Sequence, residues 1–222
     1  MTGLPNLAPL WISLRVSCCA TVIVTICGTA AAYGLYNYRH SYRSLIEGIF
    51  LIPLLLPPTV IGFVLLILLG KNSLIGGLLA QWELRLVFSW YGAVIAAAVV
   101  AFPLMYRAAV AAFSQVEPAL LDAARLDGAS ELTVFRVIAL PLAAPGIIAG
   151  IILAFARALG EFGATLMLAG NIPQETQTIP IALYFAVESG DFPTAFFWLG
   201  MVLGLSILGI FGLEHWSNHR HN

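Results

Sequence analysis

The stretch Pro118–Pro141, PALLDAARLDGASELTVFRVIALP, is the longest part of this sequence that a lipid bilayer cannot accommodate. Apolar segments long enough to cross a membrane lie on both sides of it. Its charged residues are Asp122, Arg125, Asp127, Glu131 and Arg136. A charged, helix-forming segment inside so apolar a chain requires a functional explanation.

The composition is that of an integral membrane protein. Hydrophobic residues make up 60% of the 222 residues and charged residues 9%, against roughly 25% charged residues in a typical soluble domain. This length accommodates about five or six crossings of ~20 residues each, joined by short loops. No length remains for a soluble catalytic domain, so any energy source is expected on another chain.

Five apolar segments predict an all-α membrane domain that occupies residues 1–222 as a single unit. The predicted crossings lie at about residues 10–36, 48–69, 87–105, 146–168 and 195–213. Prolines at positions 53, 57 and 58 predict a kink or break in the second segment, because proline removes a helix hydrogen bond. The apolar run within residues 178–190 is short for a crossing and is expected to form an interfacial or re-entrant helix. If it did span, the fold would have six crossings.

The distribution of Lys and Arg predicts the orientation, because cytoplasmic loops are enriched in these residues. With five crossings, Lys71 and Arg85 fall on one side of the membrane, and Arg15 lies near that interface. The other side collects Arg39, Arg43, Arg107, Arg125, Arg136 and Arg220. The N-terminus is therefore expected outside, and the C-terminus and residues 118–141 in the cytoplasm.

The cysteine and histidine residues indicate neither a metal site nor a catalytic centre. Cys18, Cys19 and Cys27 fall in the first apolar segment without a neighbouring His or acid at ligand spacing, and are expected to be small buried thiols. The histidines lie in loops or the tail, and the chain contains neither an HExxH motif nor a GxxxxGK[ST] phosphate-binding loop. The sequence therefore disfavours an intramembrane enzyme and an ATPase.

Local signals divide residues 118–141 into two short helices. Pro118 suits the first helical turn, and Gly128 suits the left-handed position just beyond a helix end, which predicts a helix over residues 118–127. Ser130 is expected to cap a second helix that runs toward Leu140 and stops at Pro141. The low Lys and Arg content favours a protein partner over a membrane surface for this segment.

These residues carry a resemblance to a known family. Asp122-Ala123-Ala124, then Gly128 after three residues, then Ile138-Ala139-Leu140-Pro141 after nine more, resembles the EAA loop of membrane-spanning subunits in binding-protein-dependent ABC importers. Asp122 stands where that pattern usually has Glu, which keeps the charge and shortens the reach. The resemblance implies a MetI-like type I ABC importer permease fold with cytoplasmic coupling helices. The implied ATPase-coupling residues are Leu120, Asp122, Ala123, Ala124, Gly128, Ile138, Leu140 and Pro141.

The same resemblance implies a set of partners. A homodimer of the permease would sit on two ATPase subunits that bind ATP and Mg²⁺ on the cytoplasmic side, while an external binding protein delivers the substrate. This chain would bind no cofactor and no nucleic acid. The implied location is the inner or plasma membrane of a bacterial cell.

Two further stretches narrow the substrate. Residues 53–70, PLLLPPTVIGFVLLILLG, and residues 157–184, RALGEFGATLMLAGNIPQETQTIPIALY, are similar to permease subunits of the molybdate and tungstate type. Sulfate and thiosulfate permeases share parts of both stretches and are the alternative within the transporter class. The loop at 170–193, which has three acids and no basic residue, is either a docking surface for the binding protein or a solvated loop.

The similar stretches contain the candidate translocation path. Arg157 and Glu161 are four residues apart deep in the fourth segment, where an unpaired charge costs at least ~2.5 kcal/mol. They are expected either to form a structural pair, which Arg15 could join, or to line or gate the path. The glycines and prolines beside them mark either helix irregularity or a hinge. The candidate path or gate residues are Pro57, Pro58, Thr59, Gly62, Arg157, Gly160, Glu161, Phe162 and Gly163.

A second feature of the fourth segment concerns helix packing. Gly146, Gly150, Ala154 and Ala158 recur every four residues, which predicts a stripe for close helix approach. A secondary carrier or a channel would explain the intramembrane charges, but neither would explain residues 118–141.

Overall fold

The computed structural model describes residues 6–36, 42–82 and 85–218. These residues form helices and turns with no β-strand among them, as the sequence predicts. The elements are α1 Ala8–Tyr36, α2 Arg43–Leu55, α3 Pro58–Leu69, α4 Leu74–Ala80, α5 Trp90–Ser114, α6 Pro118–Leu126, α7 Glu131–Thr133, the π-helix η1 Val134–Ala139, α8 Leu140–Leu159, α9 Gly163–Ala169, α10 Ile179–Glu188 and α11 Phe192–Asn218.

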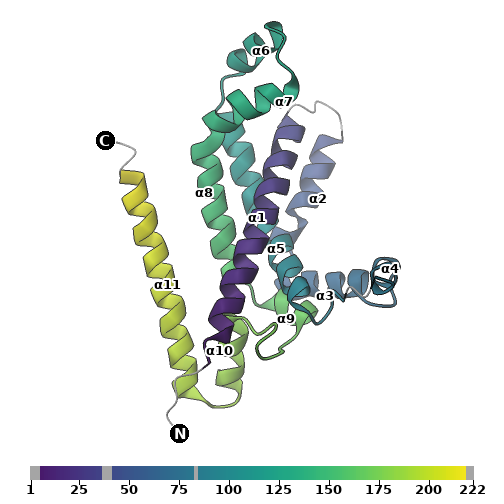
Figure 1. Cartoon of the computed structure of the whole chain (residues 1–222), viewed down its shortest axis with the longest axis vertical. Helices are drawn as coiled ribbons and strands as arrows, with labels where there is room; N and C mark the ends of the chain where they lie inside the picture. Colours follow the sequence, from purple (N-terminus) through teal and green to yellow (C-terminus); the bar gives the residue numbers. More distant parts are fainter. Residues whose placement is uncertain (1–5, 37–41, 83–84, 219–222) are drawn as a thin grey trace.

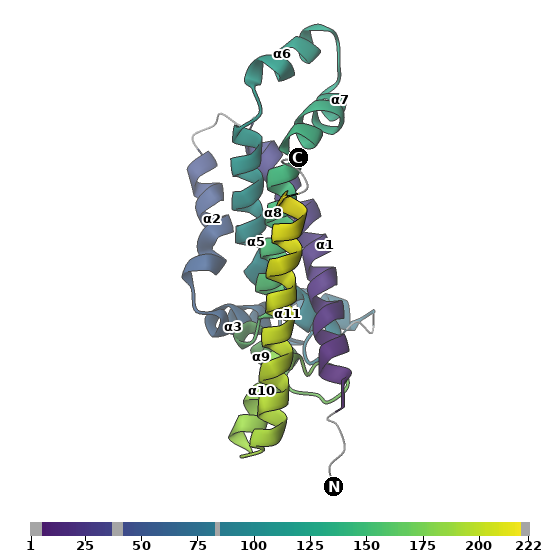
Figure 2. The same cartoon turned by 90° about the vertical axis from the view of Figure 1, so that its left-hand side faces the viewer.

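The long helices run along one axis of the molecule, whereas α3 and α4 extend to one side of it (Figure 1). α6 and α7 lie at one end of the molecule, while α10 and the start of α1 lie at the other (Figure 1). A view turned by 90° shows the same separation, with α1, α5 and α8 running between the two ends (Figure 2). α11 packs against α10 and runs from that end toward the level of α7.

Small residues hold α1, α5 and α8 together in the central bundle. A Cβ atom added to Gly146 of α8 would lie 2.6 Å from the Cβ of Ala112, and one added to Gly150 would lie 2.7 Å from the Cβ of Ala108. Ala154 and Ala158, further along the same stripe, are buried. The predicted stripe for close approach is therefore confirmed, and α5 is the helix that it contacts.

Three helices are long and apolar enough to cross a membrane within the described residues: α1, α5 and the continuous helix Glu131–Leu159 formed by α7, η1 and α8. α2 and α3 pass the same test only as a pair, bent by 114°. α10 has ten residues and rises only about 15 Å, half of a ~30 Å hydrocarbon core. Its length is that of the short helix predicted within residues 178–190.

The break at the Pro57–Pro58 pair is confirmed, but its size exceeds a kink. α2 ends at Leu55, and Leu56 and Pro57 have extended ψ angles of 146° and 136° before Pro58 begins α3. Both residues precede a proline, which disfavours helical ψ. Residues 48–69 therefore form two helices at a steep angle and not one kinked crossing.

The expectation that Pro141 ends the second coupling helix is wrong. The helix that begins at Glu131 passes through Pro141 and continues to Leu159. A proline lacks the N–H that an α-helix would direct to the residue four positions earlier, and the π-helical stretch Val134–Ala139 changes that pattern just before it. Burial of Val134, Ala139 and Ala143 in the core supports the continuous path.

Two further predicted boundaries differ from the observed ones. The segment predicted at 87–105 is the helix Trp90–Ser114, which includes Pro103 and extends well beyond residue 105 because Tyr106 and Phe113 are buried in the core. The segment predicted at 146–168 is interrupted, since α8 ends at Leu159 and α9 begins at Gly163.

The three cysteines are exposed, which corrects the expectation of buried thiols. Cys18, Cys19 and Cys27 project from the side of α1 that faces away from α5 and α8. The opposite side of α1, with Val16, Ala20, Val24 and Ala32, supplies its buried residues. In an apolar environment these small thiols remain compatible with lipid contact.

Candidate coupling element and candidate transport path

The first site is the charged segment that joins α5 to α8. α6 starts with Pro118 at its first position, and Gly128 has a φ of +88° just beyond its end, as predicted. The N–H of Gly128 donates to the carbonyl of Arg125 at 3.1 Å, which closes the turn. Ser130 caps α7, because its Oγ accepts from the N–H of Thr133 at 3.3 Å.

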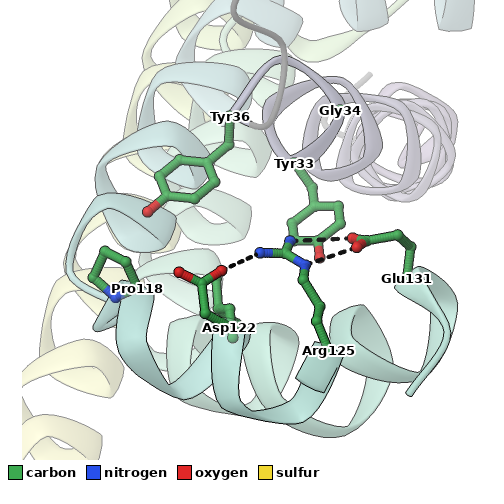
Figure 3. A pocket seen from close by; sticks show the side chains of 8 residues that line it. Tyr33, Gly34, Tyr36, Pro118, Asp122, Arg125 and Glu131 are labelled. Carbon is green, nitrogen blue, oxygen red and sulfur yellow. Dashed lines mark hydrogen bonds and ion pairs between the residues drawn. The ribbon is translucent and has the colours of Figure 1, made fainter. Parts of the chain in front are cut away.

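Arg125 connects the two short helices. Its Nη1 lies 2.8 Å from Oδ1 of Asp122, its Nε lies 2.7 Å from Oε1 of Glu131, and its Nη2 lies 3.2 Å from Oε2 of Glu131 (Figure 3). The guanidinium therefore holds Glu131 with both donors of its fork. The hydrogen bonds from Arg125 hold the pKa of Glu131 below its usual range, and those to Glu131 and Asp122 raise the pKa of Arg125.

A cavity of about 590 Å³ lies between this network and the end of α1. Figure 3 shows Tyr33, Gly34 and Tyr36 of α1 above Pro118, Asp122, Arg125 and Glu131. Leu121 also lines the cavity, is 2% exposed, and is the apolar residue that anchors α6 to the bundle. The coupling element, defined as residues 118–131, is therefore braced by one leucine and one arginine.

Three leucines of this charged segment are exposed. Leu120 is 47% exposed, Leu126 88% and Leu132 57%. Of the predicted coupling residues, Asp122, Ala123, Gly128 and Pro141 are exposed, Ala124 is half-buried, and Ile138 and Leu140 pack partly against the core. Exposed leucines at an end that carries this much charge form a surface suited to another protein.

The second site lies where α8 gives way to α9. Nη1 of Arg157 lies 2.8 Å from Oε2 of Glu161, an ion pair without the alignment of a hydrogen bond. Oε1 of Glu161 accepts from the N–H of Ala164 at 2.8 Å. The carboxylate, whose side chain is 1% exposed, thus pairs with the end of α8 and satisfies a free amide at the start of α9.

The structure brings the two predicted groups of path residues together at the contact between α3 and α9. A Cβ atom added to Gly62 would lie 2.8 Å from Cα of Ala164, and one added to Gly163 would lie 3.1 Å from Cγ2 of Thr59. Pro58 also borders Gly163, whereas Pro57 and Gly160 are exposed. The ring of Phe162 lies 5.2 Å from that of Tyr184 on α10.

Arg15 does not join Arg157 and Glu161, which corrects that expectation. Its guanidinium stands over the Trp90 ring, 5.6 Å from the centroid, and it lines a separate cavity with Arg85 and Glu175. Sequence spacing places Arg15 along α1 but does not give the direction in which it projects.

Sequence reasoning missed the roles of Arg125 and Glu131. Both were visible as charges, but their six-residue separation across Gly128 is not a helical spacing, so the pattern alone did not pair them. The other acids and cysteines do not form a metal-binding cluster within the described residues. Arg39 and Arg220, which contribute to the predicted orientation, lie outside the described residues.

Together these features define a multi-spanning helical membrane protein with a charged two-helix element at one end. The model of the family described as binding-protein-dependent transport system inner membrane component matches residues 24–215. The solved structure of the inward-facing MetNI methionine ABC transporter aligns with a TM-score of 0.69 and 16% identity over 95% of this chain and 94% of that one.

Relatives in the same class agree with that match. The YvgM permease protein of Bacillus subtilis (strain 168) is 45% identical over 95% of this chain and 93% of its own length. The molybdenum transport system permease protein ModB of Escherichia coli (strain K12) is 44% identical over 83% of this chain and 81% of its own. The sulfate transport system permease protein CysT of Salmonella typhimurium (strain LT2) is 31% identical over 91% and 73%. The chain belongs to the family of binding-protein-dependent transport system inner membrane components.

Proposed function

We propose that this chain is the membrane-spanning permease subunit of an ATP-driven importer for molybdate or tungstate. The support is the higher identity to ModB, at 44%, than to the sulfate permease CysT, at 31%. Sulfate or thiosulfate import is the second candidate, because CysT still aligns over 91% of this chain.

The observation that carries the proposal is the coupling element and its direct continuation into the membrane. The helix that leaves this element at Glu131 is unbroken to Leu159, a length of about 40 Å at 1.5 Å per residue. It ends beside the Arg157–Glu161 pair. A displacement imposed on residues 118–131 from outside would therefore move the α8–α9 junction as part of one rod.

The force would come from a partner. The chain contains no GxxxxGK[ST] loop, so ATP and Mg²⁺ would be bound by two separate ATPase subunits below a homodimer of this permease. The exposed leucines at positions 120, 126 and 132 would dock in a groove on the ATPase, while Gly128 shapes the turn and Asp122 helps to hold Arg125. An external binding protein would deliver the oxyanion.

The candidate path lies at the α3–α9 contact and the adjoining ion pair. Arg157 would attract the oxyanion, and Glu161, which already compensates its charge at 2.8 Å, would prevent tight trapping. Gly62 and Gly163 bring α3 and α9 into close approach, and a shift of one helix along the other at these two points would open or close the path. The same residues serve equally well as a rigid structural contact, so the two roles require a functional test.

The proposed orientation places the coupling element in the cytoplasm of a bacterial cell and the N-terminus outside. It is supported by the arginines at positions 43, 107, 125 and 136, and by the opposite placement of the start of α1 (Figure 1).

Purification tests this function. The permease should co-purify with an ATPase, and hydrolysis by the complex should rise when the loaded binding protein is added. A permease that purifies without an ATPase and still moves molybdate down an ion gradient would instead be a secondary carrier. Binding-protein-independent flux through the permease alone would indicate a channel.

A further inference from the structure

A second cavity, lined by two arginines and one glutamate, lies toward the end of the molecule opposite the coupling element. It has a volume of about 620 Å³ and lies between the first turns of α1, the segment that precedes α5 and the loop that precedes α10. Arg15, Arg85, Trp90, Tyr91 and Glu175 are among the residues that line it. None of them belongs to the candidate path at the α3–α9 contact.

The two arginines of this cavity contribute positive charge to its lining. Arg15 stands over the Trp90 ring at 5.6 Å from its centroid, a contact that orients the guanidinium and leaves its charge in place. Among the described residues neither Arg15 nor Arg85 forms an ion pair. Glu175 lines the same cavity without pairing to either, so the net charge of the lining is positive.

The start of α5 and the two neighbouring loops add to the features of this cavity that suit an anion. α5 begins at Trp90 with Ser89 as its cap, so the positive end of a 25-residue helix faces this region. The indole Nε1–H of Trp90 is a buried donor with no hydrogen-bond partner among the described residues. Phe88 and Gln174, in the two loops that border the cavity, have φ angles of 53° and 67°, conformations that non-glycine residues adopt mainly where the surrounding structure enforces them.

We propose that Arg15 and Arg85 form an outer receiving site for the transported oxyanion. The oxyanion occupies this site after it leaves the binding protein and before it reaches Arg157. Two guanidinium forks match a tetrahedral oxyanion, since each offers paired donors to two oxygens. One water takes up about 30 Å³, so the cavity holds the anion together with part of its hydration shell. The arginines attract the anion into the site. The negative charge of Glu175 weakens its binding there, so the anion can be released toward Arg157. This inference rests on the proposed function.

The test uses the reconstituted complex of permease, ATPase and binding protein in proteoliposomes. Initial uptake of radiolabelled molybdate is measured against the concentration of loaded binding protein for the wild type, Arg15→Gln, Arg85→Gln and the double variant. Lys71→Gln is the matched control, because it removes a positive charge that lies on the same predicted side and lines a different cavity. Arg15→Lys keeps the charge over Trp90 and guards against a folding defect, and Glu175→Gln removes the opposing charge.

Each single Arg→Gln variant should lose about tenfold in uptake at low binding-protein concentration and the double variant about a hundredfold, since hydrogen bonds to charged groups are worth roughly a decade in affinity each. Lys71→Gln should match the wild type, and Glu175→Gln should increase uptake. Arg15→Lys keeps the charge but not the paired donors, so it should lose less uptake than Arg15→Gln. The difference in uptake between the wild type and the double variant should shrink in high salt, because the charges of Arg15 and Arg85 are solvent-accessible.

Three results would overturn the receiving site. The first is unchanged uptake by the double variant while the wild type imports molybdate. The second is an equal loss of affinity for the empty and the loaded binding protein, which would make the arginines a docking contact. The third is phospholipid that co-purifies with the wild type, is lost from the double variant and leaves uptake unaffected, which would assign the cavity to a lipid phosphate. A wild-type complex that imports no oxyanion would instead contradict the proposed function.

Discussion

The Glu161 side chain is almost completely buried, and each of its oxygens has a separate task. Oε2 pairs with Arg157 at the end of α8, and Oε1 accepts from Ala164 at the start of α9. Removing one member of a buried pair leaves the other charge unpaired, which costs about 3–5 kcal/mol when both are fully buried. The cost here is smaller because the Arg157 side chain is 29% exposed.

The double variant Arg157→Met/Glu161→Gln separates a gating role from a structural one. Gln keeps an oxygen that can accept from Ala164, and no unpaired charge remains, so the complex should assemble with a melting temperature close to that of the wild type. Molybdate uptake should change at least severalfold. A variant that assembles and imports normally would show that the pair only fixes the helix register.

Gly62 permits the contact between α3 and α9. An added Cβ would lie 2.7 Å from Cβ of Met167 and 2.9 Å from the carbonyl oxygen of Ala164, so the backbone would have to move. Gly62→Ala should destabilise the permease by about 1–3 kcal/mol, as overpacking does.

Gly48 is the control for this substitution, since it lies in α2 and a Cβ added there would have no neighbouring atom within 4 Å. Gly48→Ala should be neutral or stabilising by about 0.5–1 kcal/mol, because alanine is the better helix former. Thermal unfolding of the purified proteins measures the change in stability of both variants. Equal melting temperatures for the two variants would contradict the close approach of α3 and α9.

At the scale of elements, Arg125 keeps α6 and α7 in a fixed relation. Arg125→Met should leave the bundle folded, because exposed ion pairs contribute only about 0.2–1 kcal/mol each. It should reduce the stimulation of ATP hydrolysis by the loaded binding protein severalfold, since a loosened element transmits less motion. Arg107→Met is the control, because Arg107 is an exposed arginine toward the end of α5 that leads into the coupling element. Equal stimulation in both variants would show that the bridge is dispensable for coupling.

The pH dependence of the element follows from Glu131. Its pKa is held below the usual range by the hydrogen bonds from Arg125, and burial opposes this only in part. The stability gained from the pair is therefore fully present above the unfolded-state pKa of about 4.3 and is lost as the pH falls through the lower folded-state value. Arg125 stays protonated throughout, since its pKa is raised.

Hydrogen exchange of residues 118–131, corrected for intrinsic rates, measures this effect in the complete protein. Protection should be constant between about pH 6 and 8 and should fall below about pH 4. The loss should be modest because the Glu131 side chain is 62% exposed and its charge is screened by solvent. Glu131→Gln should show, at every pH, the weaker protection that the wild type shows only at low pH. Identical pH profiles for the two proteins would contradict the bridge.

Local signals predicted α6 well and failed at Pro141 for a physical reason. Pro118, Gly128 and Ser130 act through backbone angles and side-chain caps within a few residues, and all three behave as their chemistry dictates. Pro141 removes one backbone hydrogen bond of the helix, and the π-helical stretch Val134–Ala139 already departs from the α-helical pattern just before it, so the helix continues. Packing of Val134 and Ala139 against distant residues favours this geometry, and no local pattern reports it.

At the scale of the whole molecule, the sequence located both groups of path residues but not their contact. Prolines 57 and 58 and the glycines at 160 and 163 indicated breaks in two separate segments. Their meeting depends on the 114° turn between α2 and α3, which directs α3 across α9. A proline rule predicts that a helix breaks, whereas the direction taken afterwards is set by tertiary packing. The outward projection of Cys18, Cys19 and Cys27 was missed for the same reason.

The coupling element lies at one end of the molecule, and the start of α1, which helps to line the Arg15–Arg85 cavity, lies at the other end (Figure 1). One continuous helix leads from the coupling element to the Arg157–Glu161 pair at the α8–α9 junction. An oxyanion would thus meet arginines at two successive levels, each accompanied by one glutamate.

Uptake of radiolabelled molybdate by the reconstituted complex tests the central claim most directly. The account predicts uptake that requires ATP, the ATPase and the loaded binding protein, and that equimolar sulfate does not block. Uptake that proceeds without ATP would contradict the ABC-importer function. Uptake that sulfate abolishes at equal concentration would contradict the assignment to molybdate or tungstate and favour a sulfate permease.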